Sequence, residues 1–180
     1  MDGEHENRIV ARLSEWFALE RGIPTSAARQ IRICAALHDV GKQKIPVEIL
    51  NKPGKLTVQE FEIMKTHTTL GAEILRSVQG DLGVMVRETA QLHHERYDGS
   101  GYWGVSYSDL PVYVPIVSIV DVFVALVCRR VYKPAWPPNE TLEYIESQIG
   151  TQFEPELARD FITLIKGDSR VPILFGERKM

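Results

Sequence analysis

The sequence predicts an all-α protein whose helices are joined by short turns. Apolar residues recur at helical spacing, as Ile9, Leu13, Trp16 and Phe17 do near the N-terminus. Glycine, proline and a capping motif mark helix ends. No segment alternates apolar and polar residues as a half-buried strand would. The 180 residues suit one domain with a substantial core.

The N-terminal half holds four expected helices. Gly22 and Pro24 close the first one, and a connection with a Pro-Gly turn at residues 53–54 follows the second. Thr57 and Glu60 form a T-x-x-E capping box that opens the third. The four helices are expected over residues 6–22, 26–41, 57 to about 78, and about 82–95, the last ending in two adjacent histidines.

The C-terminal half begins with a loop over 97–111 that is rich in Gly, Ser and Tyr. The apolar run that follows it, residues 112–128, is nearly long enough to span a bilayer. It contains Pro115 and Asp121, and an Asp near a bilayer centre costs about 2.5–3.5 kcal/mol. We therefore expect a core helix there. The remaining expectations are helices over about 115–131, 139–150 and 154–167 and an irregular tail over 170–180.

The composition predicts a globular soluble protein of the cytoplasm, with 44% hydrophobic and 25% charged residues. A net charge of -3 argues against a broad surface for a nucleic-acid polymer. Cys34 and Cys128 lie in apolar runs, which favours buried free thiols in a reducing compartment. The polar start "MDGEHENRIV" does not resemble a signal peptide, and no membrane span is expected.

Histidines and acids occupy unusual positions in the expected helices. His38 lies on an apolar stripe with Ile31 and Cys34, and His67 lies on another such stripe. Asp121 is the only charged residue between Asp109 and Arg129. A buried carboxylate costs several kcal/mol unless it is paired, protonated or bound to a metal.

Each of these residues also has an ordinary interpretation. A histidine on an apolar stripe is more often a hydrogen-bonded core residue, adjacent histidines are usually on the surface, and a buried Asp usually pairs with Arg. Their coincidence on several helices favours a metal centre. Imidazoles and carboxylates suit Mn, Fe, Zn or Ni, and two bridged ions need about seven ligands. The seven candidates are His5, His38, Asp39, His67, His93, His94 and Asp121.

An ordered series of motifs runs through nearly the whole chain: "HDVGKQKIP", "EFEIMKTHTTLGAEIL", "HHERYDGSGY", "DVFVAL" and "GTQFEPEL". With these motifs the sequence resembles the HD-GYP family of bacterial phosphodiesterases, a branch of the HD metal-dependent phosphohydrolases. The resemblance implies a single helical bundle with a metal centre in its core. We expect this domain over residues 1–165, with a C-terminal tail over 166–180.

The resemblance implies two divalent transition metals, Fe or Mn first and Zn or Ni as alternatives. The ligands implied for one metal are His5, His38, Asp39 and Asp121. Asp39 would bridge to a second metal, held by His67, His93 and His94. The implied reaction is hydrolysis of cyclic di-GMP by a metal-bridged hydroxide, to linear pGpG and in some members to GMP. Some members prefer the mixed GMP–AMP cyclic dinucleotide.

The resemblance also assigns roles beyond the metal ligands. Lys42 would hold the phosphate or protonate the leaving oxygen. By this resemblance, Lys42 and Asp39 are the two catalytic residues. The implied substrate-binding residues are Arg130, Lys133, Asp98, Gly101, Tyr102 and Trp103. Family members often carry an upstream sensor or receiver domain, and a homodimer is compatible with the resemblance. Three-metal members have a Glu where this chain has Met1, which implies two metals or a piece of a longer protein.

Two departures from the family pattern leave other functions open. The family's Gly-Tyr-Pro is Gly101-Tyr102-Trp103 here, and Val124 replaces the second Asp of "DVFDAL". Trp103 either fills the place of the proline or lays its indole across a guanine. The alternatives are a catalytically degenerate module that binds metal and cyclic dinucleotide, and an HD phosphohydrolase with another nucleotide substrate.

Overall fold

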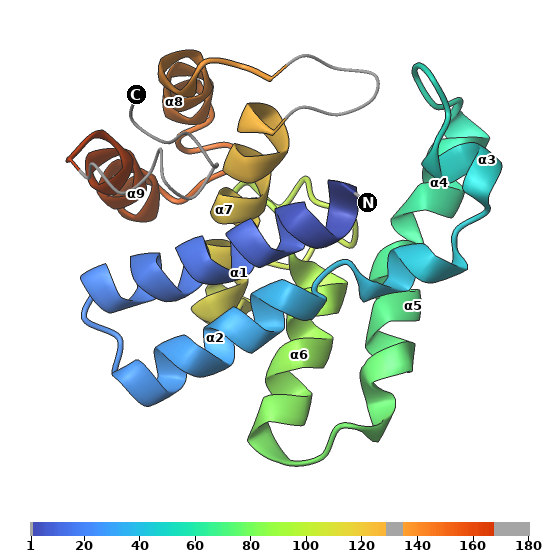
Figure 1. Cartoon of the computed structure of the whole chain (residues 1–180), viewed down its shortest axis with the longest axis horizontal. Coiled ribbons are helices and arrows are strands. Elements are labelled where there is room, and N and C mark those ends of the chain that lie inside the picture. Colours follow the sequence, from blue (N-terminus) through green and yellow to red (C-terminus); the bar gives the residue numbers. More distant parts are fainter. Residues whose placement is uncertain (1, 129–134, 168–180) are drawn as a thin grey trace.

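The computed structural model describes residues 2–128 and 135–167, and its architecture is helical, as predicted (Figure 1). Within these ranges the only β-type pairing is an isolated bridge between Ile149 and Phe153. The α-helices are α1 (Asp2–Glu20), α2 (Thr25–Leu37), α3 (Val47–Leu50), α4 (Val58–Lys65), α5 (His67–Ile74), α6 (Gly80–Leu92), α7 (Tyr113–Val127), α8 (Pro138–Ser147) and α9 (Pro155–Gly167). Short 3₁₀ helices are η1 (Val40–Lys44), η2 (Leu75–Ser77) and η3 (Tyr107–Asp109).

Helix α7 is the central element of the main hydrophobic core. The apolar run that encodes it leaves Ile116, Ile119 and Phe123 fully buried, because neighbouring helices cover α7 on several sides. The core also contains buried residues of α1, α2, α8 and α9. In the described part of the chain no helix is long and apolar enough to cross a membrane. The expectation of a core helix at this run is therefore confirmed.

A smaller hydrophobic cluster fastens the hairpin of α5 and α6 to α2. Its buried members are Cys34, Leu75, Val86 and Ala90. Figure 1 shows the two helices of this hairpin side by side to the right of α2, with α3 and α4 above α5. Cys34 is a buried free thiol, as expected, whereas Cys128 is only half-buried. Burial raises the pKa of the Cys34 thiol to about 11.

The prediction of one continuous helix from Thr57 to about Val78 is wrong, because the structure has two helices there. The capping box does open α4, since the Glu60 amide donates to Thr57 Oγ1 and the Thr57 amide donates to Glu60 Oε2. The helix ends at Lys65, and α5 starts at His67. The hydroxyls of Thr66 and Thr68 and the ring of His67 each hydrogen bond a carbonyl three residues earlier. These side chains compete for helix carbonyls and bend the chain at the first histidine of the hairpin.

Further details of the expected helices also differ from the structure. Helix α2 ends at Leu37 and gives way to a turn and η1, so residues 38–41 are not α-helical. Helix α6 ends at Leu92, which places the histidine pair just past its last turn. The connection over 45–57 contains the one-turn helix α3, whose four residues are too few for a periodic signal.

Gly41 lets η1 and α5 touch through their backbones. A Cβ built on Gly41 would lie 1.9 Å from the carbonyl oxygen of His67 and 2.5 Å from the amide nitrogen of Gly71. Both atoms belong to the backbone, so they have no flexible side chain that could move aside. The glycine at this position therefore fixes the distance between the His38–Asp39 turn and His67.

We expect Gly41→Ala to destabilise the protein by about 2 kcal/mol or more, because the added methyl group overlaps the α5 backbone. The matched control is Gly167→Ala, where nothing lies within 4 Å of the added atom. The control should stay within about 0.5 kcal/mol of the parent protein. Denaturant unfolding measures both values, and equal midpoints for the two variants would contradict the close contact.

Candidate metal centre

Six of the seven predicted metal ligands come together at one end of the α5–α6 hairpin. Five of them lie at helix ends, where the backbone changes direction. His38 and Asp39 follow α2, His67 is the first residue of α5, His93 and His94 follow α6, and Asp121 lies within α7. The segments meet because α5 packs on α6 and η1, and α7 packs on α6.

Three of the histidine rings are held in one orientation by their own backbone. His38 Nδ1 lies 2.7 Å from the carbonyl of Ala35, and His67 Nδ1 lies 2.7 Å from that of Met64. His93 Nδ1 is 3.1 Å from the carbonyl of Thr89. A carbonyl only accepts, so Nδ1 carries the hydrogen and donates it. The Nε2 lone pair of each ring is then left free for a metal.

These Nε2 atoms converge on the carboxylate of Asp39. The Nε2–oxygen distances to Asp39 are 3.3 Å from His38, 3.4 Å from His67 and 3.7 Å from His93. Asp121 approaches from the other side, with Oδ1 3.4 Å from His38 Nε2. Asp39 therefore lies at the centre of the cluster, where a ligand shared by two ions would have to lie.

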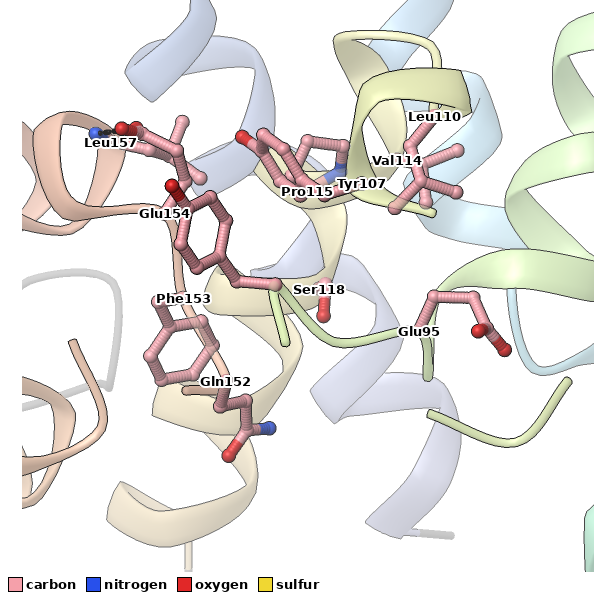
Figure 2. A pocket seen from close by; sticks show the side chains of 11 residues that line it. Glu95, Tyr107, Leu110, Val114, Pro115, Ser118, Gln152, Phe153, Glu154 and Leu157 are labelled. Carbon is pink, nitrogen blue, oxygen red and sulfur yellow. Dashed lines mark hydrogen bonds between the residues drawn. The ribbon is translucent and has the colours of Figure 1, made fainter. Parts of the chain in front are cut away.

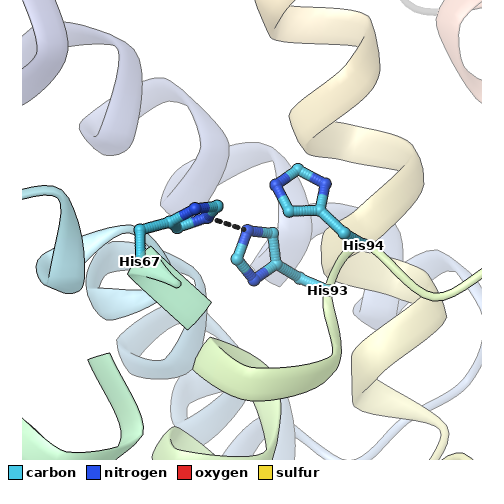
Figure 3. A group of neighbouring side chains, drawn as sticks. All are labelled: His67, His93 and His94. Carbon is cyan, nitrogen blue, oxygen red and sulfur yellow. Dashed lines mark hydrogen bonds between the residues drawn. The ribbon is translucent and has the colours of Figure 1, made fainter. Parts of the chain in front are cut away.

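The adjacent histidines take part in one group with His67. Figure 3 shows the rings of His67, His93 and His94 close together, with His67 coming from α5 and the pair from the end of α6. The Nε2 atoms of His67 and His93 are 3.4 Å apart. One nitrogen from each of the three rings lies within 4.8 Å of the others, and His38, Asp39 and His93 form a second such group. The described residues thus contain two overlapping sets of nitrogen and oxygen donors that could hold metal ions.

The cluster contains buried polar atoms that need a partner. His38 Nε2 and Asp39 Oδ1 are buried and lack a hydrogen-bond partner among the described residues. Such unsatisfied atoms are costly in a protein interior. A divalent cation would satisfy both, because a neutral imidazole and a carboxylate are suitable ligands for transition metals. The donor set therefore fits a metal centre.

The electrostatics of the cluster favour a positive charge between the carboxylates. Burial works against a charge on His38, but the carboxylates of Asp39 and Asp121 raise its pKa to about 10. Burial opposes ionisation of Asp39 and Asp121 as well, yet His38 holds the pKa of both well below the usual range. A proton on His38 and a metal cation would thus compete for the same nitrogen.

The other three histidines of the cluster are held neutral. Burial lowers the pKa of His67, and burial with the neighbouring His94 lowers that of His93 well below its usual value. Burial lowers the pKa of His94 to about 4 even though Asp121 opposes the change. Neutral imidazoles are the form that binds a metal.

The remaining catalytic and ligand candidates are placed differently. His5 is exposed on α1, and the described contacts do not join it to the cluster, so its role as a ligand stays a prediction. Lys42 forms an ion pair with Asp39 and is partly exposed at the edge of the site. Arg130 and Lys133 lie outside the described residues.

A comparison with known protein families identifies the family to which this chain belongs. The profile of the family described as HD domain matches residues 3–157, which is most of the chain. The chain belongs to the HD domain family. The adjacent His38 and Asp39 lie within the matched residues and at the centre of the cluster described above.

Curated relatives of this HD domain are phosphodiesterases by name. A Thermotoga maritima protein named cyclic di-GMP phosphodiesterase is 41% identical over 167 residues, covering 92% of this chain and 45% of the relative. A Vibrio cholerae protein named 3'3'-cGAMP-specific phosphodiesterase 2 is 42% identical over 156 residues, covering 86% of this chain and 30% of the relative. The chain thus spans less than half the length of either relative.

A solved structure supports the fold. Bd1817, a HDG"Y"P protein from Bdellovibrio bacteriovorus, superimposes with a TM-score of 0.74 at 18% identity, covering 91% of this chain and 52% of that one. This likeness shows the fold alone. The named relatives, each more than 40% identical over most of this chain, confirm the expected kinship with the phosphodiesterases of the HD-GYP type.

An open cleft of about 260 Å³ lies beside the histidine–aspartate cluster and shares His94 with it. The cleft is lined by Phe61, Lys65, His94, Arg96, Ser100, Gly101, Tyr102 and Gln152. Of the predicted substrate-binding residues, Gly101 and Tyr102 therefore line it. Asp98 accepts hydrogen bonds from the amide and hydroxyl of Ser100 and so shapes the loop turn. Trp103 does not line the cleft.

A second hollow under the same loop is much smaller. It lies between the loop, α7 and the start of α9, and Figure 2 shows its lining residues, among them Glu95, Ser118 and Phe153. Its volume is about 10 Å³, which is about the room of a single water molecule. This hollow is a packing space and cannot admit a substrate.

Glu95 is a functional candidate that sequence reasoning missed. Its side chain is buried, and its carboxylate accepts hydrogen bonds from the amides of Trp103 and Val105. Glu95 therefore holds the loop against the end of α6. The only sequence signal is its place directly after the histidine pair, and that place alone does not distinguish a buried acid from an exposed one.

We expect His93→Ala and His94→Ala each to lower the metal content of the purified HD domain, because each removes a nitrogen from the group with His67. The loss should reach about one ion per chain for His93, which belongs to both groups. Elemental analysis after equilibration with Mn(II) measures the stoichiometry. The matched control is Gln91→Ala, an exposed change on the same helix. Full stoichiometry in both histidine variants would contradict their role as ligands.

Proposed function

We propose that this HD domain is a metal-dependent phosphodiesterase that hydrolyses cyclic di-GMP to linear pGpG, and in part to GMP. The observation that carries the proposal is the convergence of four histidines and Asp121 around Asp39, with a cleft beside them. Relatives named as cyclic di-GMP and 3'3'-cGAMP phosphodiesterases support the substrate class.

The proposed cofactor is a pair of divalent transition metals, with Fe or Mn ahead of Zn or Ni. His38, Asp39 and Asp121, with His5, would hold one ion, and His67, His93 and His94 would hold the other. When bound, such ions neutralise a phosphodiester and lower the pKa of a coordinated water towards about 7. Asp39 is proposed as the shared ligand because three imidazole Nε2 atoms already face it.

Lys42 is proposed as the cation that acts on the phosphate. Its ammonium lies at Asp39 and is partly exposed, so it can reach both the metal ligands and a bound substrate. An ammonium there would stabilise charge on the phosphate or give a proton to the leaving ribose oxygen. Its present ion pair with Asp39 keeps the side chain folded over the mouth of the site.

The cleft supplies contacts suited to a nucleotide. The rings of Phe61 and Tyr102 lie 5.8 Å apart at an angle of 86°, and the ammonium of Lys65 is 6.0 Å from the centre of the Tyr102 ring. Aromatic faces stack on bases, and Lys and Arg attract phosphates. We propose that one half of the cyclic dinucleotide occupies this cleft while its phosphate faces Lys42 and the metal ligands.

The mixed GMP–AMP cyclic dinucleotide is a second candidate substrate, because the Vibrio cholerae relative is named for it. The two substrates differ in one base, and the described cleft offers the Gln152 amide as a group that could distinguish base edges. A side-by-side assay of both substrates therefore belongs to the first experiment.

We expect the protein, loaded anaerobically with Fe(II) or Mn(II), to convert cyclic di-GMP to the linear dinucleotide. Asp39→Ala should lower kcat/KM by at least about 100-fold, because losing the shared ligand disrupts both metal groups. Chromatographic separation of substrate and product over time gives the rates. The matched control is Asp81→Asn, which changes an exposed carboxylate in the first turn of α6 and should keep the parent rate.

Fully loaded protein that binds cyclic di-GMP but releases no product would contradict the hydrolase and support a catalytically degenerate binding module. Failure with both cyclic dinucleotides, together with cleavage of another nucleotide or a model phosphodiester, would support an HD phosphohydrolase of different specificity.

A further inference from the structure

Trp103 occupies the place of the proline in the Gly-Tyr-Pro motif that this sequence resembles, and it makes two hydrogen bonds. Its backbone amide donates to Glu95 Oε1 at 2.8 Å. Its indole Nε1 donates to the hydroxyl of Thr68 at 3.2 Å. A proline has no amide hydrogen and no side-chain donor, so neither bond could form with it.

The first bond belongs to a buried anchor for the loop. Glu95 also accepts the amide of Val105 at 2.9 Å, so its two oxygens hold residues on both sides of Gly104. Gly101 packs against the same residue, since a Cβ there would lie 2.5 Å from Glu95 Cα. Hydrogen bonds from amides to a buried carboxylate are stronger than neutral ones. The loop therefore lies flat against the end of α6.

The second bond ties the loop to a different helix. Thr68 follows His67 on α5 and is fully buried, and its hydroxyl donates to the carbonyl of Lys65 while accepting from the indole. The loop is thus fastened at once to α6, through Glu95, and to α5, through Thr68. Both attachment points lie one residue from a candidate metal ligand.

Tyr102 lies between these attachment points and the cleft. Its ring is 4.5 Å from the ring of His94 with an angle of 34°, and it faces Phe61 edge-on. Since Tyr102 precedes Trp103, the two bonds of Trp103 limit how far Tyr102 can move from His94. About 44% of Trp103 is exposed, so ordinary burial does not explain why a large aromatic residue is held there.

We propose that Trp103 is a positioning residue that holds Tyr102 against His94 by bridging Glu95 and Thr68. It keeps the cleft at a set width between Tyr102 and Phe61. The effect on substrate binding rests on the proposed function, whereas the effect on loop order does not. Trp103 thereby takes over the task of a rigid proline by hydrogen bonding.

The experiment compares amide hydrogen exchange in the metal-loaded protein, resolved at residues 103 and 105. Trp103→Phe keeps an aromatic ring and the backbone amide but removes the indole donor, and Thr68→Val removes the acceptor. Each should speed exchange of these amides by about 3- to 10-fold, as expected for the loss of one net hydrogen bond. The double variant should exchange no faster than either single variant, because the two changes remove the same bond.

Three control variants separate positioning from general damage. Trp16→Phe removes an indole donor on α1, and Thr69→Val removes a neighbouring hydroxyl on α5 that bonds only locally to Thr66. Both should leave the loop amides unchanged. Thr68→Ser keeps the hydroxyl and should therefore keep the slow amide exchange of the parent protein.

Substrate kinetics test whether the position of the loop affects substrate binding. Trp103→Phe and Thr68→Val should raise KM for cyclic di-GMP by about 3- to 10-fold with kcat nearly unchanged and full metal content. Unchanged loop exchange in both variants would overturn the positioning role, whatever the kinetics. Faster exchange with unchanged KM would overturn the link to substrate. Faster exchange in a protein without turnover of any cyclic dinucleotide would uphold the loop role and refute the proposed function instead.

Discussion

The hydrogen bonds from three histidine Nδ1 atoms to backbone carbonyls determine what the site can do. Each bond uses a carbonyl three or four residues earlier, so the helix end that carries the histidine also sets the direction of its ring. Because the bonds fix the ring orientation, every Nε2 faces Asp39. The backbone contact of Gly41 with α5 then sets the spacing between the groups. The candidate metal centre is therefore positioned mainly by main-chain geometry.

Most of the fold and most of the candidate metal ligands could be predicted from the sequence. Apolar spacing located the large helices, and the lone acid in the α7 run pointed to Asp121. The sequence did not predict the helix break at Thr66, because the apolar stripe continues through His67. The hydrogen bonds of Thr66, His67 and Thr68 to earlier carbonyls are visible only in the structure. The burial of Glu95 could not be predicted for a similar reason. It depends on two amides that lie 8 and 10 residues later in the chain.

The two departures from the family pattern have different structural meanings. Val124 is 1% exposed and packs in the main core, so at that position the chain has an apolar residue where apolar packing is available. Trp103 does not line the cleft, but it bonds to Glu95 just past the end of α6 and to Thr68 of α5. One departure strengthens the core and the other reinforces the loop, and neither removes a described ligand of the cluster.

The small hydrophobic cluster of Cys34, Leu75, Val86 and Ala90 has a consequence for the resistance of the α5–α6 hairpin to proteolysis. It fastens the hairpin that carries three candidate histidine ligands, whereas α1, α2, α8 and α9 share the large core around α7. A region with few buried contacts opens locally more often than the rest. An ion bound between His67 and the histidine pair would lower the frequency of such openings by mass action. Susceptibility of the hairpin to proteolysis would then fall as the metal binds.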